Sequence, residues 1–326
     1  MKRIFSFILI IFSFYLFSSE KAMDQYGTVY QAFITTINDN PTLQINIYNS
    51  NGTKTWVVVP GTEGIEKENF PNLFYSLNTS NLFVLYTKER DNGSDLYLQI
   101  MYKDFTFSES YLISEGTSSN YCINPKIYQT YKIYQNEDGS KTILQLLHII
   151  WWQKGTKEGA FYANIPVTFN GIDIDAKTIV YLNDLVSFEP AEGNEISPFL
   201  YESPEIFVPK TNENSLSLIF ADLSSLSYVI FDLSYDGENT LRDRAHFPDI
   251  GVRMPYPIPI NLSIGSNPEF LVGTEGRIAI LIKNGDNFDF TFFCNGSWAN
   301  QTRISNASNI FEAKEFVKRI IEDPNF

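Results

Sequence analysis

The sequence predicts an all-β fold, a β-propeller, made of repeated four-strand units. Short runs rich in β-branched and aromatic residues fill most of the chain, and turns rich in Asn, Asp and Gly separate them. An outline of proline, strand, turn and strand recurs, beginning at Pro71, Pro125, Pro204 and Pro268. A four-strand unit of about 45 residues buries both its apolar faces only when neighbours stack on either side. A ring of such units meets this requirement.

We expect five blades in this ring. The spacing of the prolines is uneven, which indicates that inserted loops lengthen the repeat. The count becomes six if the long irregular stretch 183–203 contains a degenerate blade. A β-sandwich is the main alternative fold, because it would not require the recurring unit.

Residues 1–19 have the pattern of a secretory signal peptide. Two basic residues precede a charge-free and mostly apolar run over 4–17, and small residues follow this run. The run is short for a membrane span. We therefore expect a secreted or periplasmic protein without stable membrane insertion after cleavage. An uncleaved N-terminal anchor is the alternative.

The propeller is expected over 20–307. Its first unit is predicted as a three-strand meander over Tyr26–Ile37, Gln44–Tyr48 and Thr55–Val59. The second unit is predicted to have strands at Asn72–Leu77, Leu82–Thr87, Asp95–Tyr102 and Phe107–Ile113. The third unit is predicted to have strands at Lys126–Tyr134, Thr142–Trp152, Ala160–Phe169 and Lys177–Leu182. Its first two strands flank a polar turn, NEDGS, and form the clearest hairpin of the chain.

The last two units have weaker final strands. The fourth unit begins at Pro204 and its last strand is expected near Arg244–Phe247. Three prolines in the following stretch, 254–267, exclude a central strand there. The fifth unit begins at Pro268 and its last strand is expected at Trp298–Ile304.

A single helix is predicted near the C-terminus, within 308–326. Asn309 and Glu312 have the spacing of a capping box, and Asp323-Pro324 ends the helix. One face is apolar and consists of Ile310, Ala313, Val317, Ile320 and Ile321. We expect this helix to cap the propeller by packing on it. A partner-binding helix is the alternative.

Composition excludes several classes of function. The formal net charge is −14, and it becomes more negative by two when the basic residues of the leader are removed. Nucleic acid is excluded as a partner because phosphate binding needs clustered Lys and Arg. No Cys or His cluster has zinc spacing, so no metal and no other cofactor is predicted. Cys122 falls just before the third unit and Cys294 late in the fifth, too far apart to bridge, so both are expected to be free thiols. We expect a monomer.

Three turn segments resemble a known motif. Residues 234–241, SYDGENTL, resemble the Asp box, S-x-D-x-G-x-T-W, which marks the third-to-fourth strand hairpin of sialidase-like propellers. The segments 136–143, NEDGSKTI, and 49–56, NSNGTKTW, have the same frame. The resemblance implies a propeller of the sialidase-like, Asp-box superfamily, in which these boxes hold tight turns and have no catalytic role.

The resemblance also supplies an alternative function, a sialidase-like glycoside hydrolase or lyase. Sialidases hold the substrate carboxylate with three arginines and use a tyrosine nucleophile with a glutamate partner and an acid aspartate. None of the arginines of this chain falls at the start of a predicted first strand, where the family pattern has them. No catalytic residue is therefore assigned.

Three residues of the third unit are expected to be structural. His148 lies within an apolar strand, where a hydrogen-bonded core histidine is expected in preference to a metal ligand. Trp151 and Trp152 offer faces for sugar stacking, but adjacent tryptophans on one strand are expected to fill the two layers between neighbouring blades.

The candidate binding residues are Tyr121, Tyr201, Tyr256 and Glu202. They are expected in the long connections between consecutive blades, which emerge together on one rim of a propeller. Aromatic and acidic side chains on such a rim suit a basic or a carbohydrate partner. The function predicted from the sequence is an exported, non-enzymatic binding or scaffolding module for a protein or a glycan.

Overall fold

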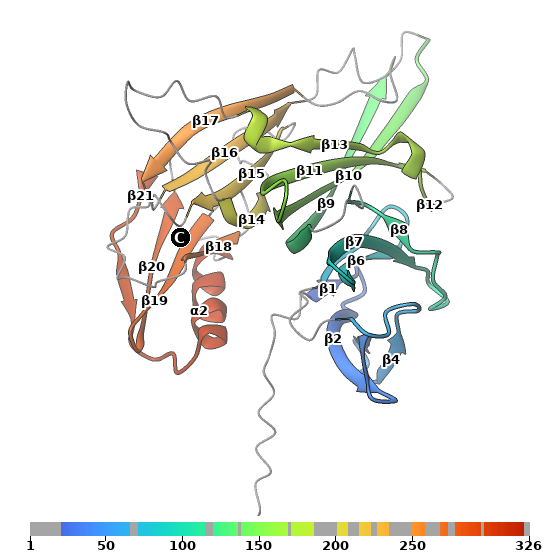
Figure 1. Ribbon diagram of the computed structural model, residues 1–326, viewed down its shortest axis with the longest axis horizontal. Helices are drawn as coiled ribbons and strands as arrows, with labels where there is room; N and C mark the ends of the chain where they lie inside the picture. Colours follow the sequence, from blue (N-terminus) through green and yellow to red (C-terminus); the bar gives the residue numbers. More distant parts are fainter. Residues whose placement is uncertain are drawn as a thin grey trace, which may run out of the picture.

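Over the residues that it describes, the computed structural model consists of β-meanders, two short 3-10 helices and an α-helix near the C-terminus (Figure 1). It describes residues 21–65, 71–114, 120–135, 138–168, 171–185, 201–207, 215–222, 227–234, 249–257, 268–272, 278–294 and 297–322. The predicted signal peptide lies outside these residues, as does most of the stretch 183–203.

The first unit is a four-stranded antiparallel sheet, and the sequence predicted only three of its strands. Its strands, in spatial order, are β1 (Lys21–Met23), β2 (Val29–Ile37), β3 (Asn40–Tyr48) and β4 (Lys54–Val58). The extra strand, β1, has three residues and no alternating pattern, so its pairing with β2 has no signal in the sequence. The Asp24–Thr28 turn that joins these two strands makes the pairing.

The second and third units share one nine-stranded sheet. The second unit contains β5 (Asn72–Ser76), β6 (Asn81–Arg90), β7 (Gly93–Met101) and β8 (Tyr111–Leu112). The third contains β9 (Tyr121–Gln135), β10 (Lys141–Lys154) and β11 (Gly159–Thr168), with β12 (Gly171–Ile172) and β13 (Thr178–Tyr181) both paired to β11. Two short 3-10 helices, η1 (Ile174–Ala176) and η2 (Leu182–Leu185), flank β13. A single parallel bridge, Ser94 to Tyr121, joins the two units.

The fourth and fifth units are separate sheets. The fourth contains β14 (Tyr201–Phe207), β15 (Ser215–Asp222), β16 (Ser227–Ser234) and β17 (Asp249–Pro257) in that order. The fifth contains β18 (Pro268–Val272), β19 (Ile278–Asn284), β20 (Asn287–Cys294), β21 (Ser297–Trp298) and β22 (Thr302–Ile304). The predicted last strand of the fourth unit, Arg244–Phe247, lies outside the described residues, and β17 takes that place. As an edge strand, β17 tolerates the prolines at its end.

The first strand of each unit contacts the first strand of the next. These contacts join β1 to β5, β5 to β9, β9 to β14 and β14 to β18. Figure 1 shows the five meanders following one another around an arc, with the helix α2 (Ile310–Glu322) at the end of the arc. The recurring unit inferred from the sequence is therefore present, and its first strands lie side by side at the inside of the arc.

Two of the four marker prolines lie inside strands. The sequence places each proline at or just before the start of a first strand, and this is correct for Pro71, which precedes β5, and for Pro268, the first residue of β18. Pro125 and Pro204 instead lie within β9 and β14, at points where the register against the neighbouring strand shifts. A proline lacks the N–H that a ladder needs, and a bulge accommodates it without ending the strand.

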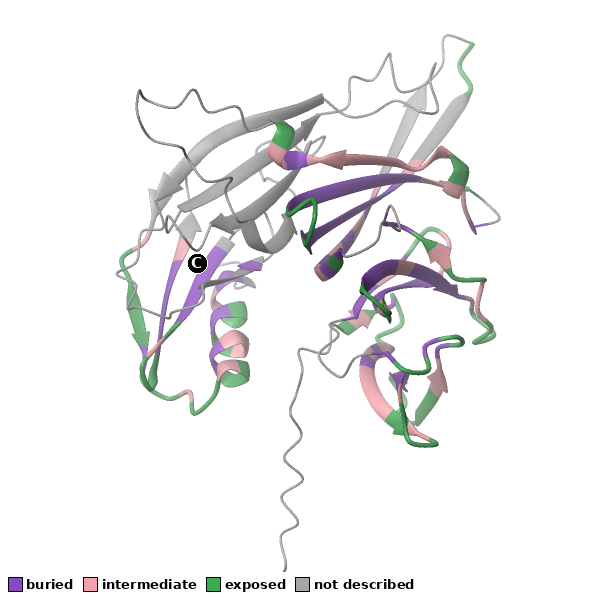
Figure 2. Cartoon of the chain, viewed as in Figure 1, coloured by how far each residue is buried: buried purple, intermediate pink, exposed green. Residues whose placement is uncertain are grey.

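The core lies between the sheets. Trp151 and Trp152 are fully buried, as predicted for tryptophans that fill layers between units. Trp151 belongs to a cluster that also contains Leu98 and Ile113 of the second unit. Figure 2 shows buried residues along the strands of the second and third units and on the inner face of α2.

The predicted C-terminal helix is present and packs on the fifth sheet. The Glu312 N–H donates to Asn309 Oδ1 at 3.0 Å, so Asn309 caps the helix as predicted, while the Glu312 carboxylate accepts from the N–H of the preceding Ser308 at 2.8 Å. Ala313, Val317 and Ile321 are buried against the fifth sheet. No helix in the described part of the chain is long and apolar enough to cross a membrane.

Candidate functional site

All four candidate residues lie in strands, whereas the sequence placed them in connections. Tyr121 is the first residue of β9, Tyr201 and Glu202 open β14, and Tyr256 is the penultimate residue of β17. The prediction was wrong because it treated the prolines as strand boundaries. β9 and β14 run through their prolines at bulges, so each strand begins earlier and each connection is shorter.

Strand direction places these residues at one edge of their sheets. In an antiparallel meander of four strands, the start of the first strand and the end of the fourth lie at the same edge. We call this edge, where the first strands begin, the leading edge. Tyr121 and Tyr201 lie there on β9 and β14, which contact each other. Tyr256 lies there on the fourth strand, three strand spacings or about 14 Å from β14.

Hydrogen bonds to Ser94 hold the residues before and after Tyr121, while Tyr121 itself is 45% exposed. The carbonyl of Asn120 accepts from the Ser94 N–H at 2.8 Å. The Ser94 hydroxyl accepts from the Cys122 N–H at 2.9 Å and donates to the Cys122 carbonyl at 3.3 Å. The ring is therefore presented to solvent from a fixed strand.

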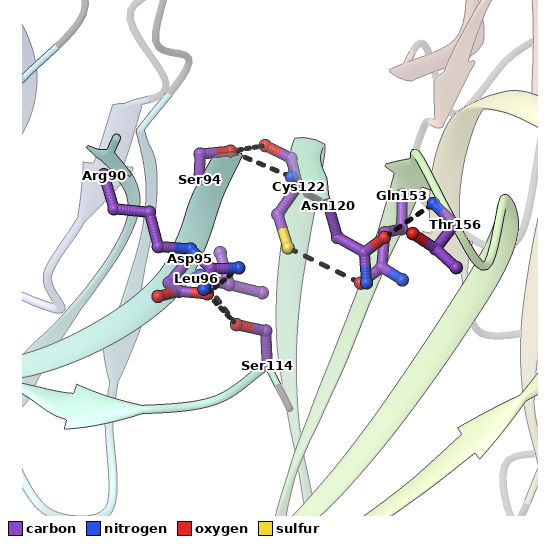
Figure 3. Close-up of polar contacts among 9 residues, drawn as sticks. All are labelled: Arg90, Ser94, Asp95, Leu96, Ser114, Asn120, Cys122, Gln153 and Thr156. Carbon is purple, nitrogen blue, oxygen red and sulfur yellow. Dashed lines mark hydrogen bonds and ion pairs between the residues drawn. The ribbon is translucent and has the colours of Figure 1, made fainter. Parts of the chain in front are cut away.

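A buried polar network surrounds this strand at the junction of the second and third units (Figure 3). On the third unit, Asn120 Oδ1 accepts from the Thr156 N–H at 3.0 Å, and Gln153 donates to the Lys157 carbonyl at 2.9 Å. These bonds tie the β10–β11 turn to the start of β9. Cys122 Sγ lies 4.0 Å from Gln153 Oε1 in the same layer.

The second unit completes the network with an ion pair. Arg90 lies 3.3 Å from Asp95, and the Ser114 hydroxyl donates to the same carboxylate at 3.4 Å. The Ser114 oxygen also accepts from the Leu96 N–H at 3.1 Å. We call this set the seam network, and its side chains are those of Arg90, Ser94, Asp95, Ser114, Asn120, Cys122 and Gln153. Its hydrogen bonds satisfy polar groups at the junction and fix the position of Tyr121.

Cys122 has no nucleophilic role in this network. Burial raises the pKa of its thiol to about 12, although a hydrogen bond with Ser114 opposes this rise. Nucleophilic cysteines have a depressed pKa, because the thiolate is the reactive form. Cys122 is a free thiol, as predicted; the side chain of Cys294 lies outside the described residues.

In a Cys294→Ser variant, the folded protein should not react with a thiol reagent at pH 8, because Cys122 is buried and protonated. One thiol should react after unfolding in guanidinium. The measurement is mass spectrometry of the labelled protein with and without denaturant. Rapid labelling of the folded protein would show that the seam network opens readily.

Tyr181, which the sequence analysis missed, lies near the leading edge of the third unit on β13. The ring of Tyr181 packs on Phe161, with centroids 5.0 Å apart, and Lys157 Nζ lies 4.4 Å from the Tyr181 centroid. The Tyr181 hydroxyl donates to the Glu158 carbonyl at 2.5 Å. Tyr181 therefore stabilises the β10–β11 turn through Glu158 and Lys157. Nothing in its apolar sequence context distinguishes it from a core residue.

His148 is a core residue, as predicted. It is fully buried, and its two ring nitrogens lie 2.7 Å from Thr130 Oγ1 and 2.8 Å from the Tyr162 hydroxyl. Both nitrogens are thus engaged in hydrogen bonds. Within the described ranges, no group of three or more His, Cys, Asp or Glu side chains is arranged to hold a metal ion.

In each of the two described turns that resemble Asp boxes, one side-chain oxygen accepts two hydrogen bonds that stabilise the turn. Asn51 Oδ1 accepts from the N–H and hydroxyl of Thr53 at 2.9 and 2.7 Å. Asp138 Oδ1 accepts in the same way from Ser140 at 2.9 and 2.6 Å. The Asn51 turn joins a third to a fourth strand, but the Asp138 turn joins a first to a second. The third segment, 234–241, lies outside the described residues except for its serine.

Comparisons with known proteins assign no family to this chain. No family model matches it, and no curated protein matches it either. Among solved structures, a mutant of the Aleuria aurantia lectin AAL in complex with Fucα1-6GlcNAc is 11% identical, with a TM-score of 0.46, covering 90% of this chain and 80% of the lectin. A subtype N10 neuraminidase-like protein of A/little yellow-shouldered bat/Guatemala is 9% identical, with a TM-score of 0.46 and coverages of 89% and 82%.

A third similar structure is the polysaccharide lyase Uly1. It is 12% identical, with a TM-score of 0.42, and the match covers 88% of this chain and 68% of the lyase. The Aleuria lectin is described as a six-bladed β-propeller. At these identities the matches transfer neither a ligand nor an activity.

The described arginines do not form a carboxylate clamp. Arg90 pairs with Asp95 in the second unit, and Arg303 pairs with Asp289 in the fifth, with Nε 2.9 Å from the carboxylate. The Arg303 hydrogen bond lowers the pKa of the buried Asp289 carboxyl. These two guanidinium groups each bind a carboxylate of their own unit.

Proposed function

We propose that the mature chain is an exported, non-enzymatic, monomeric β-propeller of five blades that binds a carbohydrate at its leading edge. The observation that carries this proposal is Tyr121, a half-exposed ring at the start of a strand fixed on both sides by the seam network. A fixed aromatic ring suits the apolar face of a sugar, because the protein loses little conformational entropy when the sugar binds.

Tyr201 and Glu202 extend this binding surface. They begin β14, which is the first strand of the fourth unit and contacts β9, so Tyr121 and Tyr201 lie at the same edge on neighbouring first strands. A tyrosine supplies a second stacking surface, and a carboxylate accepts hydrogen bonds from sugar hydroxyls. The acidic chain disfavours phosphate and other anionic partners.

The ring is proposed to close through the C-terminal helix. Lys21 of β1 lies 5.8 Å from the ring centroid of Phe311 in α2, while α2 packs on the fifth sheet. This contact links the first unit to the last. Five units and a helix then complete the ring without a sixth blade.

The test is a glycan array followed by calorimetry with the best-bound glycan. Tyr121→Ala and Tyr201→Ala should each weaken binding by up to about tenfold, which is the loss expected for one stacking ring. Thermal stability of Tyr121→Ala should be nearly unchanged, because much of the ring is exposed. Unaltered binding by both variants would exclude the leading edge.

Tyr256→Ala serves as the matched control, because it removes the same ring about 14 Å from β14 at the same edge. A small glycan should bind this variant normally. If all three variants bind weakly, the partner spans the edge and is a protein or a long polysaccharide. Release of reducing sugar from the bound glycan would contradict the non-enzymatic assignment and favour the glycoside hydrolase or lyase.

A further inference from the structure

A second group of polar aromatic residues lies between the first and second units, at the edge opposite the leading edge. The β1–β2 turn and the β5–β6 turn both follow first strands, and β1 contacts β5. The rings of Tyr30 and Tyr75 stack across this junction, with centroids 5.6 Å apart and planes 12° apart. Two turns from different units therefore meet over a tyrosine pair.

Asp24 directs a buried carboxylate toward this pair. The residue is 8% exposed, and its Oδ1 accepts from the N–H groups of Tyr26 and Thr28 at 2.9 and 2.8 Å. Its Oδ2 accepts from the Tyr30 hydroxyl at 3.4 Å, which is long for an O–H···O bond. Asp24 Oδ1 thus stabilises the turn, while Oδ2 can still accept a hydrogen bond from a donor closer than Tyr30.

The facing turn contributes hydroxyl groups. Thr79 Oγ1 is buried and has no hydrogen-bond partner. The next residue, Ser80, has a φ of 56° and donates its N–H to the Ser76 carbonyl at 2.7 Å. A non-glycine residue held at positive φ stores strain, and such strain is common in ligand sites.

Tyr26 supplies an exposed ring at the same place. It lies two residues after Asp24, its N–H is fixed by that carboxylate, and its side chain is 71% exposed. The junction therefore combines an exposed aromatic ring, a carboxylate oxygen with remaining capacity and a hydroxyl with no partner.

We propose that this junction is a second binding site, and that its ligand is a neutral sugar residue. Asp24 Oδ2 accepts from a sugar hydroxyl, the Tyr75 hydroxyl adds a second polar contact, and Tyr26 covers the apolar face of the sugar ring. An anionic sugar is excluded by the negative charge of Asp24. This site does not depend on the proposed leading-edge site, since the two lie at opposite edges.

The experiment is saturation-transfer NMR of the mature protein with methyl glycosides of neutral hexoses as probes. Asp24→Asn preserves the Oδ1 acceptor of the turn but replaces Oδ2 with an amide donor, and it should weaken binding about tenfold or more. Tyr26→Ala should weaken binding to a similar extent. Melting temperatures establish whether each variant is folded.

Tyr121→Ala separates this site from the leading edge. Hexoside binding should persist in Tyr121→Ala and be lost in Asp24→Asn and Tyr26→Ala if the junction is the site. Binding that Tyr121→Ala abolishes would place the hexoside at the leading edge and overturn the inference. It would also be overturned if no hexoside bound the wild-type protein, or if Asp24→Asn and Tyr26→Ala bound like the wild type.

Discussion

Replacing Trp151 with alanine should lower the free energy of unfolding by about 3–5 kcal/mol, the range for a buried tryptophan. The side chain is fully buried and stacks on Phe161 with ring centroids 5.3 Å apart. Its cluster includes Leu98 and Ile113, which belong to the second unit. The substitution therefore opens a cavity between two units, and the surrounding strands can fill it only in part. Urea denaturation monitored by circular dichroism measures the loss.

Trp56→Ala is the matched control, because Trp56 is 57% exposed on the outer strand β4. Its loss should change the free energy of unfolding by about 0.5 kcal/mol or less. Equal losses for the two tryptophans would contradict the packing between the second and third units. Trp151→Phe should fall between the two, since it keeps a smaller ring in the same layer.

Gly93→Ala should separate the second unit from the third at the leading edge. A Cβ on Gly93 would lie 2.3 Å from the carbonyl oxygen of Asn120, the same oxygen that accepts from the Ser94 N–H. The obstructing atom belongs to the backbone, so a side-chain rotation cannot relieve the clash. We expect a loss of about 3 kcal/mol, at the upper end of the usual cost of overpacking. Tyr121 follows Asn120, so glycan binding at the leading edge should fall as well.

The control for this substitution is Gly139→Ala in the β9–β10 turn. Gly139 has a φ of 80°, and the methyl group of an alanine there would have no atom within 4 Å, so only backbone strain should oppose the substitution. That cost is about 1–2 kcal/mol, and glycan binding should be unaffected. If Gly93→Ala is as stable and as active as the wild type, the junction is looser than its hydrogen bonds indicate.

Most of the repeating architecture can be predicted from the sequence, because it depends on local patterns. Turn residues and alternating apolar runs locate most strands, and the Asn309–Glu312 spacing locates the helix. Strand starts are less predictable wherever a proline lies in a first strand. The sequence cannot show whether Pro125 ends a strand or occupies a bulge, since this depends on the register against β10.

The candidate sites are less predictable than the fold. The tyrosines at 121 and 201 were found because aromatic residues near connections are conspicuous, although they proved to be in strands. Asp24 and Tyr75 were missed, since 51 residues separate them and no local pattern links a turn to the strand of another unit. Their proximity follows from the contact of β1 with β5.

The shared sheet of the second and third units has a consequence for unfolding. A chain of independent repeats can lose one unit while its neighbours remain folded. Here the bridge at Ser94, the seam network and the cluster around Trp151 all cross the same junction, so opening either unit exposes apolar surface on the other. The second and third units, β5 to β13, should therefore unfold together rather than one at a time, as a cooperative part twice the size of the unit that the sequence repeats.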